Sequence, residues 1–369
     1  MKILVTGGAG FIGSHIVDSL VEGGHQVTVF DLLDPQVHGN SAPEYLNPKA
    51  KFVRGDVTKR EDWMKVLEDT EIIFHNAAAV GTGQSMYQIE KYVKVNTLGT
   101  AIMLDLLVNK DFDVKKLIVA SSMSIYGEGM YKCGDCGVVC PEHRPESQLK
   151  AKQWEPRCPS CGKTLKPIPT SEDKPLRPPN IYSITKKDQE EMCLSIGKAY
   201  GIPAVALRYF NVYGPRQSLN NPYTGVCAIF MSRIKNNHPP IVYEDGNQSR
   251  DFINIKDIVQ ANLLAMEKSK ADYGVFNVGT GTPVSIKKIS ELLIQLQNKK
   301  LKPELPDKFR AGDIRHCYAD ISKIEKLGFK PSVNLKDGLS DLVKWAGSQQ
   351  AKDGFEQAAK ELQDKGLTR

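Results

Sequence analysis

The chain has 369 residues, of which 41% are hydrophobic and 25% charged, a composition that predicts a globular protein of one large or two intimate domains. Its formal net charge of +6 is compatible with an anionic small-molecule substrate but too weak and too scattered to indicate nucleic acid, and we expect no nucleic-acid partner. No apolar stretch approaches the roughly 20 residues of a membrane-spanning helix, and the N-terminus carries no secretory signal. We therefore expect a cytoplasmic protein with no membrane partner.

The N-terminal stretch predicts a dinucleotide-binding turn. A short apolar run leads into Gly7, Gly10 and Gly13, and a helical apolar pattern follows. At this spacing the first glycine permits a tight turn and the second lets the backbone approach a pyrophosphate at the helix N-terminus. The third lets the helix pack closely on the strand. Phe11 and Ile12, which lie between the second and third glycines, are assigned to the same cofactor site.

The strand expected over residues 26–30 is followed by Asp31. Its carboxylate lies at about the right distance beyond the glycines to accept hydrogen bonds from the ribose hydroxyls of a dinucleotide. Leu32 and Leu33 come next, in place of an arginine or lysine that could take a 2′-phosphate. The sequence therefore predicts NAD rather than NADP as the cofactor.

Two later strand ends extend the expected cofactor site. The strand expected over 51–55 is followed by Asp56 and Val57, and the carboxylate suits either the adenine amino group or the cap of the next helix. The strand expected over 71–75 is followed by small residues, among them Ala77, which would let a cofactor lie against the backbone. Both interpretations of Asp56 stay open at this point.

Strands that alternate with helical patterns predict an α/β fold built on a doubly wound parallel Rossmann sheet. One helix is expected over 95–109, and Asn96 near its start is assigned to the cofactor site. We expect an NAD-binding core at 1–129, a zinc-ribbon-like insertion at 130–175 and a return to the core with the catalytic helix at 176–205. A smaller mixed α/β domain, mainly for the substrate, is expected at 206–350, within which 252–278 returns to the core. Residues 351–369 are expected to form a peripheral tail.

Three polar side chains form the candidate catalytic group. Tyr182 and Lys186 lie four residues apart at the start of an expected helix, so both side chains share one face. A phenol has an ordinary pKa of about 10, and a neighbouring ammonium lowers that pKa by favouring the phenolate. Ser122, beyond the strand expected over 116–120, can hydrogen-bond the same substrate oxygen. Together these groups predict proton removal from a sugar or alcohol hydroxyl while a hydride passes to NAD.

A series of motifs along nearly the whole chain outside the insertion and the tail completes this pattern. They are Thr6-Gly7-x-x-Gly10-x-x-Gly13, Asp31, Asp56, Ser121-Ser122-x-x-x-Tyr126-Gly127, Tyr182-x-x-x-Lys186, Arg208-Tyr209-Phe210-Asn211-x-Tyr213-Gly214-Pro215-Arg216, Arg250-Asp251-Phe252 and Arg310-x-Gly312-Asp313. The sequence thereby resembles the extended short-chain dehydrogenase/reductase superfamily, in its nucleotide-sugar epimerase/dehydratase branch.

The resemblance implies a nucleoside-diphosphate-sugar substrate and an NAD that is regenerated in each turnover. It also implies a homodimer that pairs the helices expected near 95–109 and 182–200. The implied substrate contacts are Asn211, Arg250 and Arg310 with the diphosphate, Val226 in the segment 223–226 with the nucleobase, and Ser122 and Ser124 with the sugar.

Two departures from the branch bear on the reaction. Its 4,6-dehydratases place an Asp-Glu pair directly after the residue that matches Ser122, whereas this chain has Met123 and Ser124. Neither can serve as the acid or base for water elimination, so dehydration is disfavoured. Epimerases restricted to unmodified hexoses tend to have a bulky tyrosine where this chain has Cys317. The smaller residue indicates either a roomier sugar pocket or simple core packing.

Within the branch, the segments 34–39, 80–87 and 122–129 are most similar to the dTDP-L-rhamnose 4-epimerase subgroup. UDP-glucose or UDP-N-acetylglucosamine 4-epimerase is the second candidate. A nucleotide-sugar 4,6-dehydratase and a non-catalytic Rossmann binding protein are weaker alternatives. The complete set of Ser122, Tyr182 and Lys186 argues against the last of these.

The insertion contains two Cys-x-x-Cys knuckles. Paired knuckles at this separation suit a tetrahedral zinc site with four thiolates, and we expect one structural zinc. The insertion joins Ser122 to Tyr182, so both of its ends should lie near the active-site mouth, where it could form a wall or lid over the sugar. The expected ligands are Cys133, Cys136, Cys158 and Cys161, with Cys140 and His143 as spare potential ligands.

Overall fold

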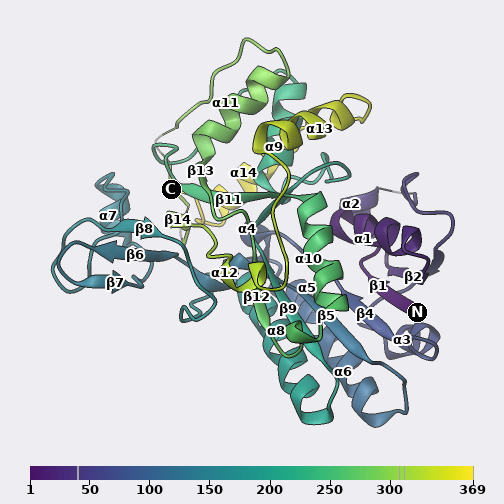
Figure 1. Ribbon diagram of the computed structural model, residues 1–369. Coiled ribbons are helices and arrows are strands. Elements are labelled where there is room, and N and C mark those ends of the chain that lie inside the picture. Colours follow the sequence, from purple (N-terminus) through teal and green to yellow (C-terminus); the bar gives the residue numbers. More distant parts are fainter. Residues whose placement is uncertain (40, 307, 311, 369) are drawn as a thin grey trace.

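The computed structural model describes residues 1–39, 41–306, 308–310 and 312–368, and its centre is a seven-stranded sheet (Figure 1). All six strand pairings in this sheet are parallel, which confirms the predicted Rossmann class. The strand order is β12 (Val275–Val278), β9 (Ala204–Tyr209), β5 (Lys116–Ser122), β4 (Ile72–His75), β1 (Lys2–Thr6), β2 (Gln26–Asp31) and β3 (Lys51–Arg54). The order reverses between β1 and β4, and such a reversal opens a crevice at the carboxyl ends of the strands.

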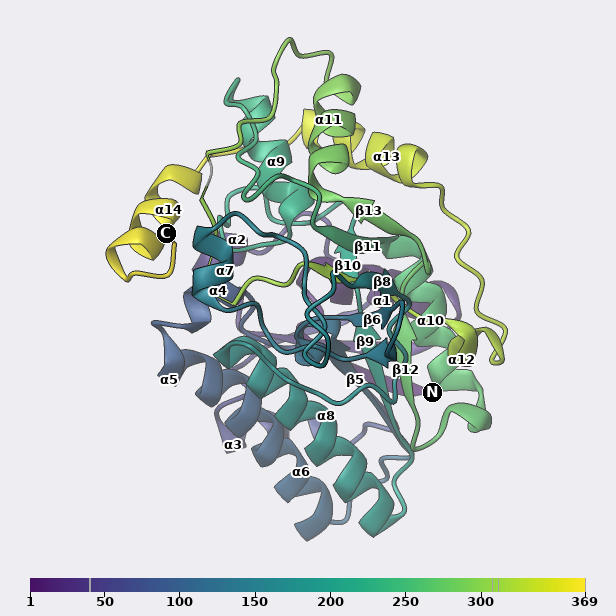
Figure 2. The ribbon, with the colours of Figure 1, turned by 90° about the vertical axis from the view of Figure 1, so that its left-hand side faces the viewer.

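Helices cover both faces of this sheet. On one face, α1 (Phe11–Glu22) and α10 (Ile255–Glu267) share a core with β1 and β9. On the other face, α3 (Arg60–Leu67), α6 (Gly99–Asn109) and α8 (Ile181–Tyr200) form a second core with β4 and β5. A π-helical turn at Val93–Leu98 precedes α6, and Figure 2 shows α6 and α8 running side by side. The sheet is therefore buried on both sides.

A smaller second sheet adjoins the carboxyl edge of the first. It contains β10 (Asn211–Tyr213), β11 (Ser249–Asn254), β13 (Pro283–Ser285) and β14 (His316–Cys317). The helices α9 (Val226–Lys235), α11 (Ile286–Leu296) and α13 (Leu335–Gly347) enclose its core. Short helices complete the two sheet regions: α2 (Pro35–His38), α4 (Thr82–Ser85), α5 (Ile89–Tyr92) and α12 (Ser322–Glu325).

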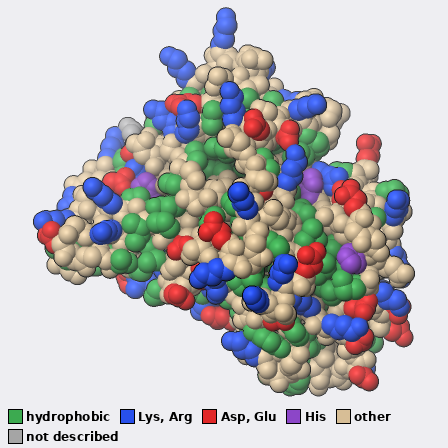
Figure 3. Space-filling view, viewed as in Figure 1, with side chains coloured by type: hydrophobic (Ala, Val, Ile, Leu, Met, Phe, Trp, Pro, Cys, Tyr) green, Lys and Arg blue, Asp and Glu red, His purple; other side chains and the backbone are tan. Residues whose placement is uncertain are grey.

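The insertion forms a separate lobe with an antiparallel sheet of its own. Its strands are β6 (Met130–Cys133), β7 (Gly137–Val139) and β8 (Lys166–Ile168), with α7 (Glu146–Lys150) between β7 and β8. The lobe projects at the left in Figure 1, and basic and hydrophobic side chains are both visible on its surface in Figure 3. Its apolar cluster is small and contains Tyr131, Cys133, Cys158 and Leu165, and Leu149 in α7 is buried as well.

The C-terminal segment folds as α14 (Phe355–Asp364), seen in yellow in Figure 2. This helix buries Phe355, Ala358 and Leu362. Glu361 accepts hydrogen bonds from the hydroxyls of Tyr223 (2.6 Å) and Tyr87 (2.9 Å). The tail therefore packs against loops of both sheet regions. Within the described ranges, no helix is both long and apolar enough to cross a membrane.

Candidate active site

The turn after β1 requires its glycines for steric reasons. Gly7 has φ +66°, and a Cβ at this position would lie 2.9 Å from the backbone nitrogen of Ala77. A Cβ at Gly13 would lie 2.2 Å from the carbonyl oxygen of Gly7. Helix α1 begins directly after Gly10, and no side chain accepts a capping hydrogen bond from its first amides. This arrangement is suited to a bound pyrophosphate.

A cavity of about 410 Å³ opens in front of this turn at the carboxyl ends of the central strands. It contains most of the residues that the sequence assigned to the cofactor and to catalysis. Five assigned residues lie outside its described lining: Asn96, Ser124, Val226, Arg250 and Arg310. The assigned residues that line it are Gly7, Gly10, Phe11, Ile12, Gly13, Asp31, Asp56, Val57, Ala77, Ser122, Tyr182, Lys186 and Asn211.

Asp31 ends β2 at the rim of this cavity. Its carboxylate accepts hydrogen bonds from the amides of Ala9 (3.0 Å) and Leu33 (2.8 Å). His38 lies 3.9 Å away and also lines the cavity, although sequence reasoning did not single it out. Burial lowers the pKa of His38, and the carboxylates of Asp31 and Asp34 oppose part of that shift.

Asp56 has a local structural role. Its Oδ1 accepts hydrogen bonds from the amide and the hydroxyl of Thr58, both at 2.8 Å. Asp56 is also among the residues that line the cavity. The turn and a ligand contact are therefore compatible.

Ser122, Tyr182 and Lys186 all line this cavity. Burial raises the pKa of Tyr182, and a hydrogen bond with Ser122 opposes part of that rise. Burial lowers the pKa of Lys186 to about 8, against the favourable charge of nearby Glu190. The ammonium therefore remains the main form of Lys186 at neutral pH, and it lies one helical turn after Tyr182 on α8.

Lys186 is positioned by a buried polar chain that sequence reasoning missed. Its Nζ donates to Oε1 of Gln189 (2.9 Å), and Nε2 of Gln189 donates to Thr100 (2.8 Å) and contacts His75 (3.2 Å). His75 in turn is hydrogen-bonded to Thr6 (2.9 Å). Burial, with a smaller contribution from the charge of Lys186, lowers the pKa of His75 to about 3, so the imidazole is neutral. The sequence signal for this polar chain was His75 itself, a histidine at the end of an otherwise apolar strand.

Asn96 and Ser124, two of the assigned residues, form hydrogen bonds to neighbouring groups of the protein. Asn96 is fully buried and clamps the backbone of Ala79, whose amide donates to it (2.7 Å) and whose carbonyl accepts from it (3.1 Å). Ser124 donates its hydroxyl to that of Ser122 (2.9 Å). Neither lines the described cavity, because both side chains turn into the protein to hold the loops that form its wall.

Within the described part of the chain, four polar atoms of cavity-lining residues have no hydrogen-bond partner. Three are Nδ2 of Asn76, Oδ1 of Asn211 and Oε1 of Gln217, while the fourth, Nη1 of Arg216, lies 2.7 Å from the carboxylate of Asp18. A buried polar atom without a partner is costly, so these atoms on residues that line a cavity favour a polar ligand. The glycine cradle and these atoms together fit a dinucleotide and a second polar molecule.

The two arginines assigned to the diphosphate belong to the second sheet region. Arg250 donates to the carbonyls of Ser249 (2.8 Å), Arg315 (3.1 Å) and Ile314. The guanidinium of Arg310 lies 4.4 Å from the ring centre of Tyr243, and its Nε has no partner among the described residues. Val226 begins α9. Cys317 is fully buried beside Met123, Tyr126 and Phe210 and is not itself among the described lining residues, which fits core packing.

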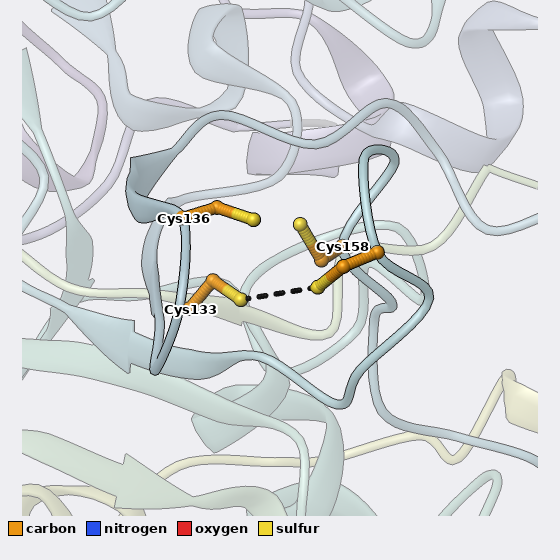
Figure 4. A group of neighbouring side chains, drawn as sticks. Cys133, Cys136 and Cys158 are labelled. Atoms are coloured by element: carbon orange, nitrogen blue, oxygen red, sulfur yellow. Dashed lines mark hydrogen bonds between the residues drawn. The ribbon is translucent and has the colours of Figure 1, made fainter.

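The four cysteines of the two knuckles converge in the insertion. Their sulfur atoms all lie within 4.8 Å of one another, and Figure 4 shows the side chains of Cys133, Cys136 and Cys158 pointing toward a common centre. A tetrahedral zinc–thiolate site, with Zn–S near 2.3 Å, requires sulfurs about 3.8 Å apart. Among the described residues, neither Cys140 nor His143 belongs to this group.

Comparison with known proteins assigns the chain to a family. The sequence profile described as "NAD dependent epimerase/dehydratase family" matches residues 3–145 and 158–279. The chain belongs to this family. Residues 146–157, inside the insertion, fall between the two matched stretches of this epimerase/dehydratase profile. The resemblance seen in the sequence motifs is thereby confirmed.

Individual members of the epimerase/dehydratase family match over nearly their whole length. A protein from Burkholderia thailandensis described as dTDP-L-rhamnose 4-epimerase is 36% identical over 352 residues, 94% of this chain and 95% of the relative. The structure of UDP-glucose 4-epimerase from Thermotoga maritima with UDP-glucose has a TM-score of 0.76 at 32% identity and covers 94% and 98% of the two chains. UDP-glucuronic acid 4-epimerase from Bacillus cereus, in complex with UDP-glucuronic acid and NAD, gives 0.77 at 28% identity, covering 94% and 99%.

Proposed function

We propose that the protein is an NAD-dependent nucleotide-sugar 4-epimerase, an isomerase that inverts the C4 hydroxyl of its substrate. The observation that carries the proposal is the convergence of Ser122, Tyr182 and Lys186 with the glycine turn in one cavity. The nucleotide-sugar 4-epimerases among the similar proteins support the same reaction class.

NAD is the proposed cofactor. The amides at the start of α1 would hold its pyrophosphate, and Asp31 would accept hydrogen bonds from a ribose, while Asp56, Val57 and Ala77 would face the adenosine end. When bound, NAD supplies the acceptor and later the donor of the C4 hydride. The complex of the Bacillus cereus relative with NAD supports this choice.

Side chains of the protein accept and return the proton of the C4 hydroxyl. Tyr182 accepts this proton as a phenolate that Lys186 stabilises by charge, and Ser122 holds the same oxygen through its hydroxyl. After the sugar presents its other face, Tyr182 returns the proton to the C4 oxygen. Ser124 fixes the Ser122 hydroxyl, and Asn96 fixes the backbone at Ala79 that borders the site.

For the substrate we propose dTDP-L-rhamnose, on the similarity to the Burkholderia thailandensis protein. Asn211, Arg250 and Arg310 would bind the diphosphate, and Val226 would lie near the nucleobase. UDP-glucose or UDP-N-acetylglucosamine is the second candidate, supported by the Thermotoga maritima structure. Met123 and Ser124 lack the acid and base for dehydration, and the intact catalytic group argues against a non-catalytic binding protein.

We also propose one structural zinc in the insertion, held by Cys133, Cys136, Cys158 and Cys161. A thiolate site of this kind suits a reducing compartment, and the cytoplasm is the proposed location. The proposed homodimer would pair α6 and α8 of two copies. Leu98 before α6 and Ile184 on α8 are 45% and 41% exposed, and such exposed apolar side chains support an interface there.

A panel of dTDP- and UDP-sugars tests the proposal. Purified protein incubated with each compound should convert at least one of them reversibly to its C4 epimer, as read by NMR of the sugar ring protons. Irreversible loss of water with no C4-inverted product would establish the dehydratase alternative instead. Mass spectrometry of nucleotide sugars that co-purify with the protein would identify the substrate directly.

A further inference from the structure

The insertion docks on the second sheet region through a cluster of charges in which the side chains of Arg144, Glu244 and Arg315 are buried and that of Glu155 is 38% exposed. Arg144 and Glu155 come from the insertion, and Glu244, Arg315 and His316 come from the second region. Arg315 is 1% exposed, so its charge must be neutralised within the protein. This set of five residues is called the docking cluster below.

Glu155 has the central position in the docking cluster. Its Oε1 accepts from Nε (2.9 Å) and Nη2 (2.6 Å) of Arg315, and its Oε2 lies 2.9 Å from Nε2 of His316. Arg315 and His316 are consecutive residues, and His316 belongs to β14. One carboxylate from the insertion thereby fixes two neighbouring side chains at the start of this strand.

The segment fixed by Glu155 is the one that orients Arg250. The guanidinium of Arg250 donates to the carbonyls of Ile314 and Arg315. In addition, β14 pairs with β11, with Arg250 opposite Cys317. A shift of the backbone at residues 314–316 would therefore move the arginine that is proposed to bind the substrate diphosphate.

Arg144 supports the second arginine in a similar way. It donates to both carboxylate oxygens of Glu244 (2.8 and 3.0 Å) and to the carbonyl of Asp313 (3.0 Å). Glu244 follows Tyr243, and the guanidinium of Arg310 stacks over the ring of Tyr243. Arg250 and Arg310, the two arginines proposed to bind the substrate, thus both contact segments that the insertion contacts.

The cysteine group determines where Glu155 lies. Glu155 precedes Cys158 by three residues and lies directly before the hairpin that contains Cys158, which is closed by hydrogen bonds from Cys158 to Lys163 (2.8 Å) and from Leu165 to Pro156 (3.0 Å). The insertion has too small an apolar core to hold this hairpin by burial alone. A metal bound by the four sulfurs would fix the knuckle and, with it, the carboxylate.

We infer that Glu155 is a positioning residue for substrate binding, and that the metal-bound insertion acts through it to hold Arg250 in place for the diphosphate. This inference rests on the proposed function. It stands beside the wall or lid expected from the sequence, which stays a prediction, because the described cavity lining includes neither residues 130–175 nor Arg250 and Arg310.

The variant Glu155→Ala tests the inference without leaving a buried charge unpaired, since Arg315 keeps Glu244 (2.9 Å) and Asp245 (2.7 and 3.0 Å) as partners. We expect the KM for the nucleotide sugar, and the Kd of dTDP and UDP by calorimetry, to rise about 2- to 30-fold, the range of such indirect coupling. Both kcat and NAD content should stay at the wild-type level. Glu155→Gln, which retains one acceptor oxygen, should lie between wild type and Glu155→Ala.

Glu142→Gln is the matched control, because Glu142 belongs to the same insertion and its side chain is 84% exposed. It should bind both nucleotides like the wild type. Removal of the metal through Cys158→Ser with Cys161→Ser should reproduce the effect of Glu155→Ala, and combining all three changes should add little.

Three outcomes would overturn parts of the account in distinguishable ways. Unchanged nucleotide affinity in Glu155→Ala, or an equal loss in Glu142→Gln, would refute the role of Glu155. Metal loss without a change in nucleotide affinity would refute the coupling to the metal. A wild-type protein that binds neither dTDP nor UDP and epimerises no nucleotide sugar would refute the proposed function itself. NAD content and thermal unfolding report on folding in each variant.

Discussion

Tyr182 is the residue on which the proposed chemistry depends most. Replacing it by phenylalanine removes the proton acceptor and keeps the ring that packs edge-on against Tyr92. Because general-base catalysis contributes about 10²- to 10⁴-fold, Tyr182→Phe should lower kcat by about that factor while NAD content persists. The control is Tyr200→Phe, at the exposed end of the same helix, which should keep full activity. Unchanged turnover in Tyr182→Phe would remove this residue from the mechanism.

His75 gives a pH-dependent prediction at the same scale. Its pKa is about 3 in the folded protein and about 6.5 in an unfolded chain. Between these values the unfolded state binds a proton that the folded state does not, so stability falls as the pH falls through this window and rises as the pH rises.

We therefore expect His75→Gln to flatten the fall in the free energy of unfolding between about pH 6.5 and 4, measured by urea titration. His25→Gln, which changes a less buried histidine near the surface, should keep the wild-type slope. Equal slopes in wild type and His75→Gln would contradict a neutral, buried imidazole.

Among the elements, the insertion gives a prediction of metal content. Structural zinc contributes on the order of 10–16 kcal/mol in small finger peptides, enough to fold a lobe with so few buried apolar side chains. Purified protein should contain one zinc per chain, and Cys158→Ser with Cys161→Ser should abolish it. Cys140→Ser, a change in the same insertion outside the sulfur group, should retain the metal. Zinc that persisted in the double variant would refute the ligand assignment.

Helix α14 gives a second prediction at this scale. Leu362 is 6% exposed and packs over Gly83 in α4. Leu362→Ala should lower the free energy of unfolding by about 2–4 kcal/mol, measured by denaturant titration. Lys360→Ala, an exposed change in the same helix, should stay within about 0.5 kcal/mol. Equal free energies of unfolding for the wild type and Leu362→Ala would mean that α14 is not docked in solution.

For the molecule as a whole, the sequence predicted what local patterns encode. The glycine turn, the strands of the central sheet and the Tyr182–Lys186 spacing each depend on residues that are near neighbours in the chain. The two Cys-x-x-Cys knuckles were visible for the same reason. The structure brings these local units together as the Rossmann order requires.

The contacts that could not be predicted join residues far apart in sequence. Glu155 and Arg315 are separated by 160 positions, and no periodicity or motif relates them. The clamp of Asn96 on Ala79 and the packing of Leu362 against Gly83 are similar cases. In each case the side chain is an ordinary polar or apolar residue, and only the assembled fold shows what it touches.

The most direct test of the central claim follows a label at C4 of the nucleotide sugar. If the proton leaves through Tyr182 and the hydride passes to bound NAD and back, a substrate deuterated at C4 should give an epimer that keeps its deuterium in ordinary water. Unlabelled substrate in D₂O should likewise gain no deuterium on carbon. Loss of the C4 label to solvent, or incorporation of solvent deuterium at C3 or C5, would contradict transient oxidation at C4.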